Sequence, residues 1–401
     1  MLMNSLDKKY YIVDFGASRR YFHQYPLIIG ISQFLSKNGH EPIVLLPYIA
    51  DKMDVNFAIG EINYILDSGY SSRDSKIMRH LFRKLLTITC RKQQSGQRIK
   101  ARLRQAYIKS GLEYFHNINK SENSSKHIIF PTLDPLSLQL ALKLSLESKM
   151  DDYHFYFRVI GAESRGILSS SNELKSLLDL VELYPRNIRI GIETIGYKSY
   201  LEDLGFKTSC IYWSPWPSLN YLKKVKLVNK SKSLLIGFLG CAKQRKGFDN
   251  IPKILRQLKS NGVNFGILIQ ESNFPWVGYE KTINDIRLVM GSEFEFLPSN
   301  LELVKLLESI NQCDLLILPY DANSYSINAS GVLYHACDYS VPVITAKGVG
   351  FASEIENFNL GLTYSNLDEI SGIVKKVQMI KSDFLSYNSE RDKANYQFLF
   401  G

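Results

Sequence analysis

Three cations follow a glycine turn in the second half of the chain. The loop reads Gly240-Cys-Ala-Lys243-Gln-Arg245-Lys246-Gly247, after an apolar run and before a helical pattern that begins at Gly247. The free N–H groups and the dipole of a helix start attract anions, and Lys and Arg add charge-assisted hydrogen bonds. The spacing therefore predicts an anion-binding loop. The alternative is a basic surface loop that only connects a strand with a helix.

A second polar stretch follows the apolar run Leu315–Pro319. It contains Asn328 and then Ser330-Gly331, where another helical pattern begins, and Gly348-Val-Gly350 offers a permissive turn further along. The first N–H groups of that helix lack intrahelical partners and suit a phosphate. Alternatively, Ser330 is only a helix cap and Gly331 only allows close packing. Because both polar stretches follow predicted parallel strands, we expect them at the ligand-binding edge of a sheet.

Three carboxylates follow predicted strands in the first half of the chain, Asp134, Glu163 and Glu193. Each could serve as an acid, a base or a ligand for an acceptor hydroxyl. Taken singly, each is more typical of a surface carboxylate or a helix cap. No Asp-x-Asp triplet, H-E-x-x-H, G-x-S-x-G or P-loop motif occurs, so we expect neither a bound metal nor a cofactor.

The elements that must position these residues alternate between strand and helix. Candidate strands of the first half are Tyr10–Phe15, Pro42–Pro47, His127–Pro131, Tyr153–Val159, Ile188–Glu193 and Thr208–Tyr212, with helical patterns at Phe22–Lys37, Leu136–Glu147 and Glu173–Glu182. Those of the second half are Leu234–Leu239, Val263–Ile269, Glu293–Leu297, Leu315–Pro319 and Pro342–Thr345, with helical patterns at Phe248–Ser260, Leu301–Asn311, Gly331–Asp338 and Leu367–Ile380. This alternation predicts an α/β fold with two Rossmann-like domains facing a cleft.

The segment Tyr212–Ser218 interrupts the alternation, because its two prolines and two tryptophans do not fit a regular element. We place an interdomain linker here. The expected domains are 1–215, 216–385 and a last helix at 386–401 that packs back toward the N-terminal domain.

The net charge of +10 is concentrated in one segment of the chain. Between Arg73 and Lys109 there are twelve basic residues and one acid, Asp74, a local charge of +11. Apolar residues between Ile77 and Thr89 recur at helical spacing, which predicts a basic amphipathic helix. Such a helix suits an anionic membrane surface or the phosphates of an acceptor. It could also pack on its own domain, and no nucleic-acid-binding motif accompanies it, so we expect no nucleic-acid partner.

The composition is that of a folded protein, with 401 residues, 45% hydrophobic and 22% charged. No uncharged stretch is long and apolar enough to cross a bilayer, and the N-terminus lacks the pattern of a secretory signal. The five cysteines are scattered without a C-x-x-C pair. We therefore expect a cytoplasmic protein.

These motifs resemble those of the "group 1" glycosyltransferases of the GT-B fold, over about residues 234–365. The spacing from Gly240 to Lys246-Gly247 matches, and so does the helix at Ser330-Gly331 followed by Val341-Pro-Val-Ile. One branch of the family reads Tyr-x-x-Arg-x-Ser-Gly. Here Tyr325, Ser330 and Gly331 match that motif, and Asn328 replaces its arginine. The chain departs from the family at its paired glutamates, which are Ile327 and His335, and at Cys241, which replaces an arginine.

The resemblance implies an enzyme that moves a sugar from a nucleotide diphosphate sugar to an acceptor hydroxyl. The residues implied to bind the donor are Gly16, Gly240, Arg245, Lys246, Asn328, Ser330 and Gly331, and Lys246 would contact the pyrophosphate. The acceptor is expected to be a glycan or a lipid-linked glycan, as in bacterial surface polysaccharide or lipopolysaccharide assembly, with residues 73–109 at the inner face of the cell membrane. The alternatives are a catalytically silent binding protein of the same fold and a nucleotide-sugar epimerase.

Overall fold

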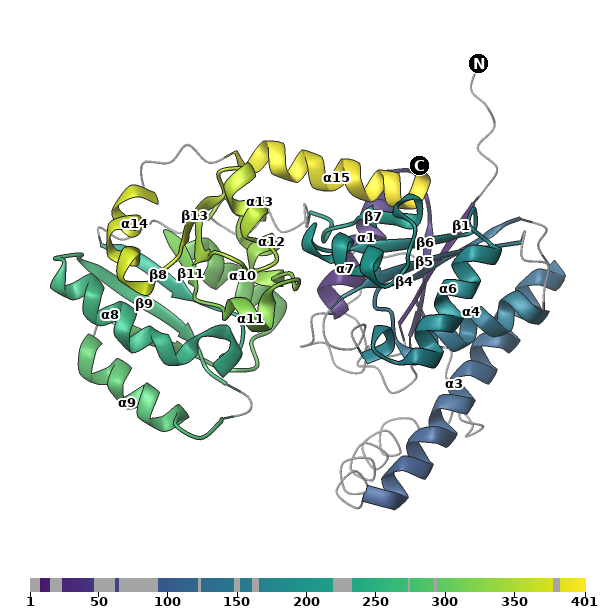
Figure 1. The fold of residues 1–401 in the computed structure, drawn as a ribbon, viewed down its shortest axis with the longest axis horizontal. Helices are drawn as coiled ribbons and strands as arrows, with labels where there is room; N and C mark the ends of the chain where they lie inside the picture. The colour runs from purple at the N-terminus through teal and green to yellow at the C-terminus, as the bar shows by residue number, and fades with distance from the viewer. Residues whose placement is uncertain are drawn as a thin grey trace. The chain divides into compact units, whose positions relative to one another are not determined.

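The computed structural model describes most of the chain (Figure 1). The described residues are 8–14, 24–46, 62–64, 93–121, 124–147, 152–160, 166–218, 233–272, 275–291, 294–377 and 383–401. The predicted site residues Gly16 and Glu163, and the apolar stripe between Ile77 and Thr89, lie outside them. The chain divides into two compact units. Unit 1 comprises residues 1–191 and 205–212, and unit 2 comprises residues 192–204 and 213–401.

Unit 1 is built on a seven-stranded sheet in the order β3-β2-β1-β4-β5-β6-β7. Its strands are β1 (Lys9–Val13), β2 (Pro42–Leu46), β3 (Ile62–Tyr64), β4 (Lys126–Phe130), β5 (Tyr153–Val159), β6 (Ile188–Ile192) and β7 (Ile211–Trp213). The pairs from β3 to β5 are parallel. The buried strands read as apolar runs, and the rings of Phe130 and Phe157 stack 5.1 Å apart in the core.

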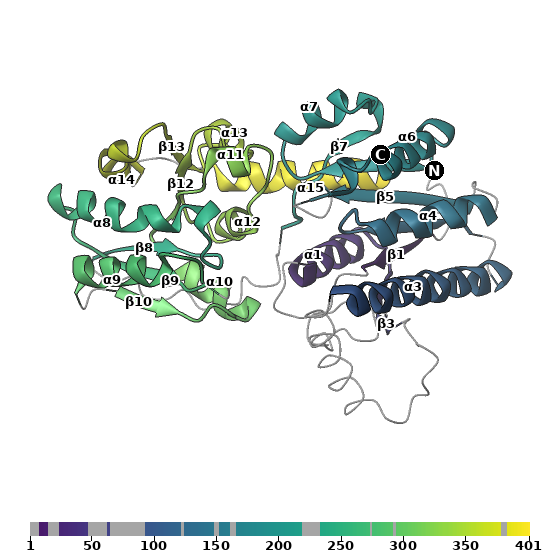
Figure 2. The same cartoon turned by 60° about the horizontal axis from the view of Figure 1, so that its bottom comes forward.

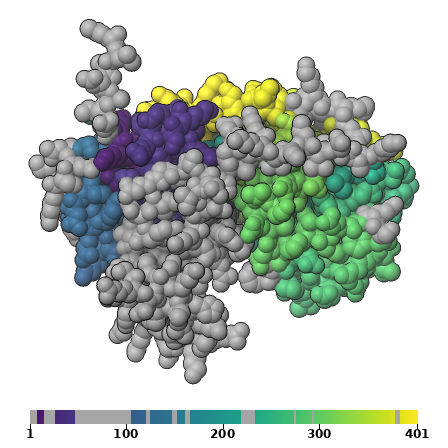
Figure 3. All heavy atoms as spheres, turned by 180° about the vertical axis from the view of Figure 1, so that it is seen from behind, coloured from purple at the N-terminus to yellow at the C-terminus, as the bar shows by residue number. Residues whose placement is uncertain are grey.

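Helices connect these strands, as parallel pairing requires. They are α1 (Gln24–Lys37), α3 (Gln93–Ser121), α4 (Pro135–Glu147), α6 (Ser171–Leu183) and α7 (Gly196–Asp203). Helix α3 packs along α4, which packs in turn on α6 (Figure 2). Part of the purple α1–β2 segment is visible at the surface in the space-filling view from behind (Figure 3).

Unit 2 is built on a six-stranded sheet in the order β10-β9-β8-β11-β12-β13, parallel throughout. Its strands are β8 (Leu234–Phe238), β9 (Phe265–Gln270), β10 (Phe294–Leu297), β11 (Leu315–Leu318), β12 (Val343–Ala346) and β13 (Gly361–Tyr364). The chain runs outward from β8 to β10 and returns to β11 on the other side of β8. The order therefore reverses between β8 and β11, where parallel sheets bind ligands.

The helices of unit 2 are α8 (Ile251–Ser260), α9 (Tyr279–Met290), α10 (Leu303–Gln312), α11 (Ala322–Tyr325), α12 (Gly331–Asp338), α13 (Ala352–Asn357), α14 (Ile370–Val377) and α15 (Phe384–Phe400). Helix α8 illustrates why they form where they do. Ile254, Leu255 and Leu258 recur at helical spacing and are buried, whereas Lys253 and Arg256 point to solvent. The apolar face joins the main core of unit 2.

The α/β fold with two parallel-sheet units is confirmed, and the predicted helix Gly331–Asp338 has the bounds of α12. Some predictions were wrong in detail. The predicted strand Thr208–Tyr212 begins as a 3-10 turn at Thr208–Cys210 and becomes extended only at Ile211. Six further elements were not predicted, namely β3, α7, α9, α11, α13 and β13, and α3 continues from the predicted basic segment 73–109 to Ser121. No helix within the described residues is long and apolar enough to span a membrane.

The predicted linker at Tyr212–Ser218 has no regular structure after Trp213, as its prolines require. However, residues 214–217 are buried within unit 2 rather than solvent-exposed. The C-terminal residues 386–401 lie in α15, which also belongs to unit 2. Its packing toward the N-terminal domain stays a prediction.

Candidate functional site

The loop after β8 turns sharply at Gly240, which has φ +95°. The backbone N–H groups of Gly240 and Cys241 both donate to Oε1 of Gln270, at 2.8 Å each. A methyl group on Gly240 would lie 2.6 Å from the Val332 side chain, 3.3 Å from Nζ of Lys246 and 3.8 Å from the hydroxyl of Tyr320. The glycine therefore allows the loop after β8, the segment after β11 and helix α12 to bring three side chains to one point.

Lys246 is a partly buried cation at this point. Its ammonium group donates to the Gly240 carbonyl at 2.5 Å and lies 5.4 Å from the centre of the Tyr320 ring. Burial lowers the pKa of Lys246, opposed by Tyr325 and Cys241 and assisted by the nearby Arg245 charge. An ammonium group has three donors, so this one retains capacity to bind an anion.

Gly247 ties the basic loop to the end of β11. It has φ +69°, and a Cβ atom at this position would lie 1.7 Å from the Pro319 carbonyl oxygen. The N–H of Asp321 donates to the Arg245 carbonyl at 3.2 Å. The exposed Arg245 guanidinium lies 5.5 Å from the centre of the Tyr325 ring, a cation–π geometry. Two polar loops that are far apart in the sequence thus form one surface.

Ser330 begins α12 in the manner predicted for a helix cap. Its hydroxyl accepts from the N–H of Leu333 at 3.4 Å and lies 3.3 Å from the Tyr320 hydroxyl. Burial raises the pKa of Tyr320 to about 12, so this hydroxyl stays protonated. The N–H groups of Gly331 and Val332 have no hydrogen-bond partner within the described part of the chain. They provide free donors at the positive end of the helix.

Asn328 lies on the approach to α12 and is only 8% exposed. Its amide nitrogen donates to the Ser324 carbonyl at 3.2 Å, while its Oδ1 has no partner among the described residues. Asp321 instead caps the short helix α11 by accepting from the N–H and the hydroxyl of Ser324. These bonds lower the pKa of Asp321. Asn328 therefore offers an acceptor that a ligand could use, while the accepting oxygen of Asp321 is engaged locally.

The candidate carboxylates are used structurally where they are described. Asp134 caps α4 by accepting from the N–H groups of Leu136 and Ser137, at 2.8 Å each. Glu193 is 6% exposed, and its Oε1 accepts from the indole N–H of Trp216. These contacts neither establish nor exclude an acid–base role for either carboxylate, and Glu163 lies outside the described residues.

His335, at the position of the family's second glutamate, is 3% exposed. Its ring meets that of Trp216 edge-on at 5.7 Å. Burial, with a smaller effect of Arg391, lowers the pKa of His335 to about 3, so the ring is neutral at ordinary pH. A neutral, buried imidazole cannot replace an ionised carboxylate.

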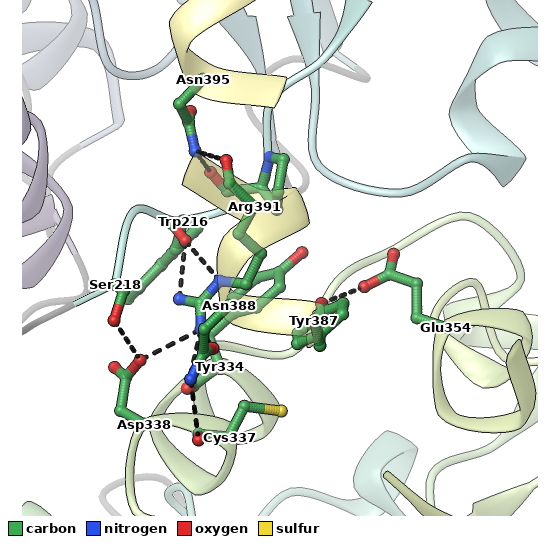
Figure 4. A network of polar contacts seen from close by, with 11 residues as sticks. Trp216, Ser218, Tyr334, Cys337, Asp338, Glu354, Tyr387, Asn388, Arg391 and Asn395 are labelled. Atoms are coloured by element: carbon green, nitrogen blue, oxygen red, sulfur yellow. Dashed lines mark hydrogen bonds and ion pairs between the residues drawn. The ribbon is translucent and has the colours of Figure 1, made fainter. Parts of the chain in front are cut away.

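Arg391 holds the far side of α12 (Figure 4). Its Nε and Nη2 donate to the Trp216 carbonyl at 2.9 and 2.7 Å, and its Nη1 donates to Asp338 at 3.0 Å and to Asn388 at 2.8 Å. Burial by itself would lower the pKa of Arg391, but the Asp338 carboxylate and neighbouring groups raise it overall. The contact fixes α12, and with it Ser330, against the segment that contains Trp216.

The structure thus brings together Gly240, Arg245, Lys246, Ser330 and Gly331, with Asn328 nearby in the same polar loop. Sequence reasoning missed Tyr320 and Gln270. Each is a polar side chain that ends or directly follows an apolar strand, a signal that the sequence does contain. No group of His, Cys, Asp and Glu suited to a metal was found within the described residues.

No model of a protein family matches the chain, and no curated protein sequence matches it significantly. Solved structures do match in fold. Sucrose-phosphate synthase from Thermosynechococcus elongatus is 10% identical with a TM-score of 0.63, over 98% of this chain and 96% of that chain. HepE from Anabaena in complex with UDP and glucose is 13% identical with a TM-score of 0.56, over 97% of each chain.

The lipopolysaccharide outer core galactosyltransferase WaaB is also similar, at 13% identity and a TM-score of 0.55, over 98% of this chain and 97% of that chain. These matches extend over almost the whole of each protein. The chain therefore has the GT-B fold of these glycosyltransferases, as its motifs predicted.

Proposed function

We propose that the chain is a glycosyltransferase that moves a sugar from a nucleotide diphosphate sugar to an acceptor hydroxyl. The observation that carries the proposal is the convergence of Lys246 with the free N–H groups at the start of α12, at the point where the strand order of unit 2 reverses. This combination of a cation and a helix start suits a diphosphate. HepE, which has the same fold, is known in complex with UDP-glucose, which supports a nucleotide-sugar donor.

In the proposed reaction, the bond between the anomeric carbon and the diphosphate oxygen breaks while the acceptor oxygen bonds to that carbon. Negative charge develops on the departing diphosphate. Lys246, Arg245 and the first N–H groups of α12 would stabilise it without reorganising, because the fold already orients them. The acceptor hydroxyl must lose its proton, and Asp134, Glu163 and Glu193 stay the predicted candidates for the group that receives it. No metal is required by this scheme.

We further propose a glycan or lipid-linked glycan as the acceptor, in surface polysaccharide or lipopolysaccharide assembly. The name of WaaB and the charge of residues 73–109 support this setting. The enzyme would work in the cytoplasm, with the basic segment at the inner face of the membrane. Co-sedimentation with anionic vesicles that weakens with salt would support the membrane contact, and binding insensitive to salt would count against it.

Nucleotide binding tests the donor site directly. Calorimetry with UDP, GDP and dTDP should show that one of them binds the wild-type protein, in EDTA as well as with Mg²⁺. Lys246→Ala should weaken that binding about tenfold or more, because a lost hydrogen bond to a charged group has about this effect. Lys253→Ala is the matched control, since Lys253 on α8 is exposed and forms an ion pair with Asp368 away from the loop after β8. Failure of all three nucleotides to bind would overturn the proposal.

A catalytically silent binding protein is the second candidate. The observation that favours it is the absence of both family glutamates, with Ile327 and a neutral His335 in their positions. Slow hydrolysis of the bound nucleotide sugar separates the two functions, because a working transferase generally hydrolyses its donor when no acceptor is present. Binding without any hydrolysis or transfer would favour the silent protein.

A further inference from the structure

Tyr320 is the side chain that links the two halves of the proposed diphosphate site. It lies two positions after the end of β11, is buried, and packs against Tyr325 with ring centres 4.5 Å apart and against Phe351 at 5.8 Å. These contacts fix the ring. Its face lies 5.4 Å from Nζ of Lys246, and its hydroxyl lies 3.3 Å from that of Ser330. One rigid side chain therefore touches the cation of the first loop and the helix cap of the second.

We propose that Tyr320 is a positioning residue for diphosphate binding, holding the Lys246 ammonium group with its ring face and the Ser330 hydroxyl with its own hydroxyl. The inference rests on the proposed function and assigns a role that the sequence motifs did not indicate. It makes two separable statements, one about the ring and one about the hydroxyl.

The ring compensates for the burial of the Lys246 charge. Within the described residues, Lys246 donates one hydrogen bond, to the Gly240 carbonyl, and Asp and Glu are absent from the groups that influence its charge. The groups that face it are Arg245, Tyr325, Cys241 and the Tyr320 ring. A ring face attracts a cation most strongly where water is excluded. Removing the ring should therefore make Lys246 easier to deprotonate.

The hydroxyl of Tyr320 orients the start of α12. It is protonated at ordinary pH, so it can donate to the Ser330 oxygen, which also accepts from the Leu333 N–H, and this leaves the Ser330 O–H group free to donate to a ligand. Removing only this hydroxyl should affect the helix start and leave the cation in place. The two statements therefore predict different results for phenylalanine and leucine at this position.

Binding of the nucleotide diphosphate, measured between pH 7 and pH 10, tests both statements. Tyr320→Phe keeps the ring and should bind the nucleotide about threefold more weakly at every pH. Its affinity should fall at alkaline pH over the same pH range as that of the wild type. Tyr320→Leu should bind about tenfold more weakly at pH 7 and lose affinity at lower pH than the wild type. Tyr364→Phe, which removes a hydroxyl from a buried tyrosine of the edge strand β13, is the matched control and should bind normally.

A double-mutant cycle guards against a general packing defect in Tyr320→Leu. In a Lys246→Ala background, Tyr320→Leu should add only about the threefold loss of Tyr320→Phe, because the cation that the ring holds is gone while the contact of the hydroxyl with Ser330 is still removed. The inference would be overturned if the two substitutions reduced nucleotide affinity additively, or if the affinity of Tyr320→Leu fell at the same alkaline pH as that of the wild type. The proposed nucleotide site would stand in either case. Loss of all nucleotide binding in the wild type would instead overturn the proposed function.

Discussion

Arg391 is a fully buried cation and Lys246 a partly buried one in the same unit, and their surroundings differ. Arg391 has hydrogen-bond partners along its whole guanidinium group and an ion pair with Asp338, and its pKa is raised. Among the described residues, Lys246 has the Gly240 carbonyl and the Tyr320 ring face as partners, and burial lowers its pKa. Burying a charge is costly unless partners compensate for the lost water. Groups of the fold compensate for the burial of the Arg391 charge, whereas the Lys246 charge is suited to compensation by a bound anion.

Replacing Arg391 should have the largest effect on this comparison. Arg391→Met removes the charged partner of the Asp338 carboxylate, which also accepts from the Ser218 hydroxyl, and two donors to the Trp216 carbonyl, so the free energy of unfolding should fall by about 3–5 kcal/mol. Urea unfolding measures this. Lys393→Met on the same helix should change it by less than about 0.5 kcal/mol, because Lys393 is exposed and its ion pair with Glu390 lies at the surface. A loss below about 1 kcal/mol for Arg391→Met would show that Arg391 does not stabilise the fold more than Lys246 does.

Replacing Glu354, in the same region, should have a smaller effect on the free energy of unfolding, and this effect should depend on pH. Burial raises the pKa of Glu354 to about 8, and a hydrogen bond from Tyr387 and the Arg391 charge only partly oppose the shift. The folded state thus retains a proton that the unfolded chain loses near its ordinary pKa. The stability from this group is fully present below about pH 4.5 and is lost as pH rises through about 8.

Glu354→Gln should therefore flatten the alkaline decline in stability. The variant and the wild type should diverge by about 2 kcal/mol in the free energy of unfolding between pH 6 and pH 8. His335 acts in the opposite direction, because its contribution is present above its ordinary pKa of 6.5 and is lost as pH falls toward 3. Parallel curves for the two proteins above pH 6 would show that Glu354 is ionised in the fold.

Lys246→Met should have the smallest effect on stability, which would distinguish Lys246 clearly from Arg391. Removing a desolvated charge with few partners should leave the free energy of unfolding unchanged or raise it by up to about 1 kcal/mol without ligand. Thermal unfolding with and without the nucleotide measures this, and the ligand should stabilise only the wild type appreciably. A loss above about 2 kcal/mol would indicate that Lys246, like Arg391, holds the fold.

Much of the fold was predictable because its signals are local. The apolar run of β11 and the Ser-Gly start of α12 each lie within a few residues, and both predictions are confirmed. Helix α9 was missed although Tyr279, Ile283 and Met290 carry the helical spacing. Strand β3 has three residues, too few for a periodicity to be recognised.

The segment after β7 has contacts that the local sequence does not predict. Its two prolines predicted an irregular linker, but not that Trp216 would be buried. The Trp216 ring packs against that of Tyr334, and Arg391, 175 positions away, donates to the Trp216 carbonyl. Asn395 similarly donates to the carbonyl of Pro215, 180 positions away. Contacts of this kind leave no periodic signal in the sequence.

The sequence by itself determined which chemical groups the site contains and which secondary structure precedes them, because glycine turns, helix starts and apolar spacing act over a few residues. Only the tertiary structure decided which of those groups keep unused hydrogen-bonding capacity for a ligand. It pairs the Glu193 carboxylate with Trp216, neutralises His335, saturates Arg391 and leaves Lys246 underpaired. The physical reason is that desolvation and hydrogen-bond partners come from elements distant in the chain, and these together set the charge of each group.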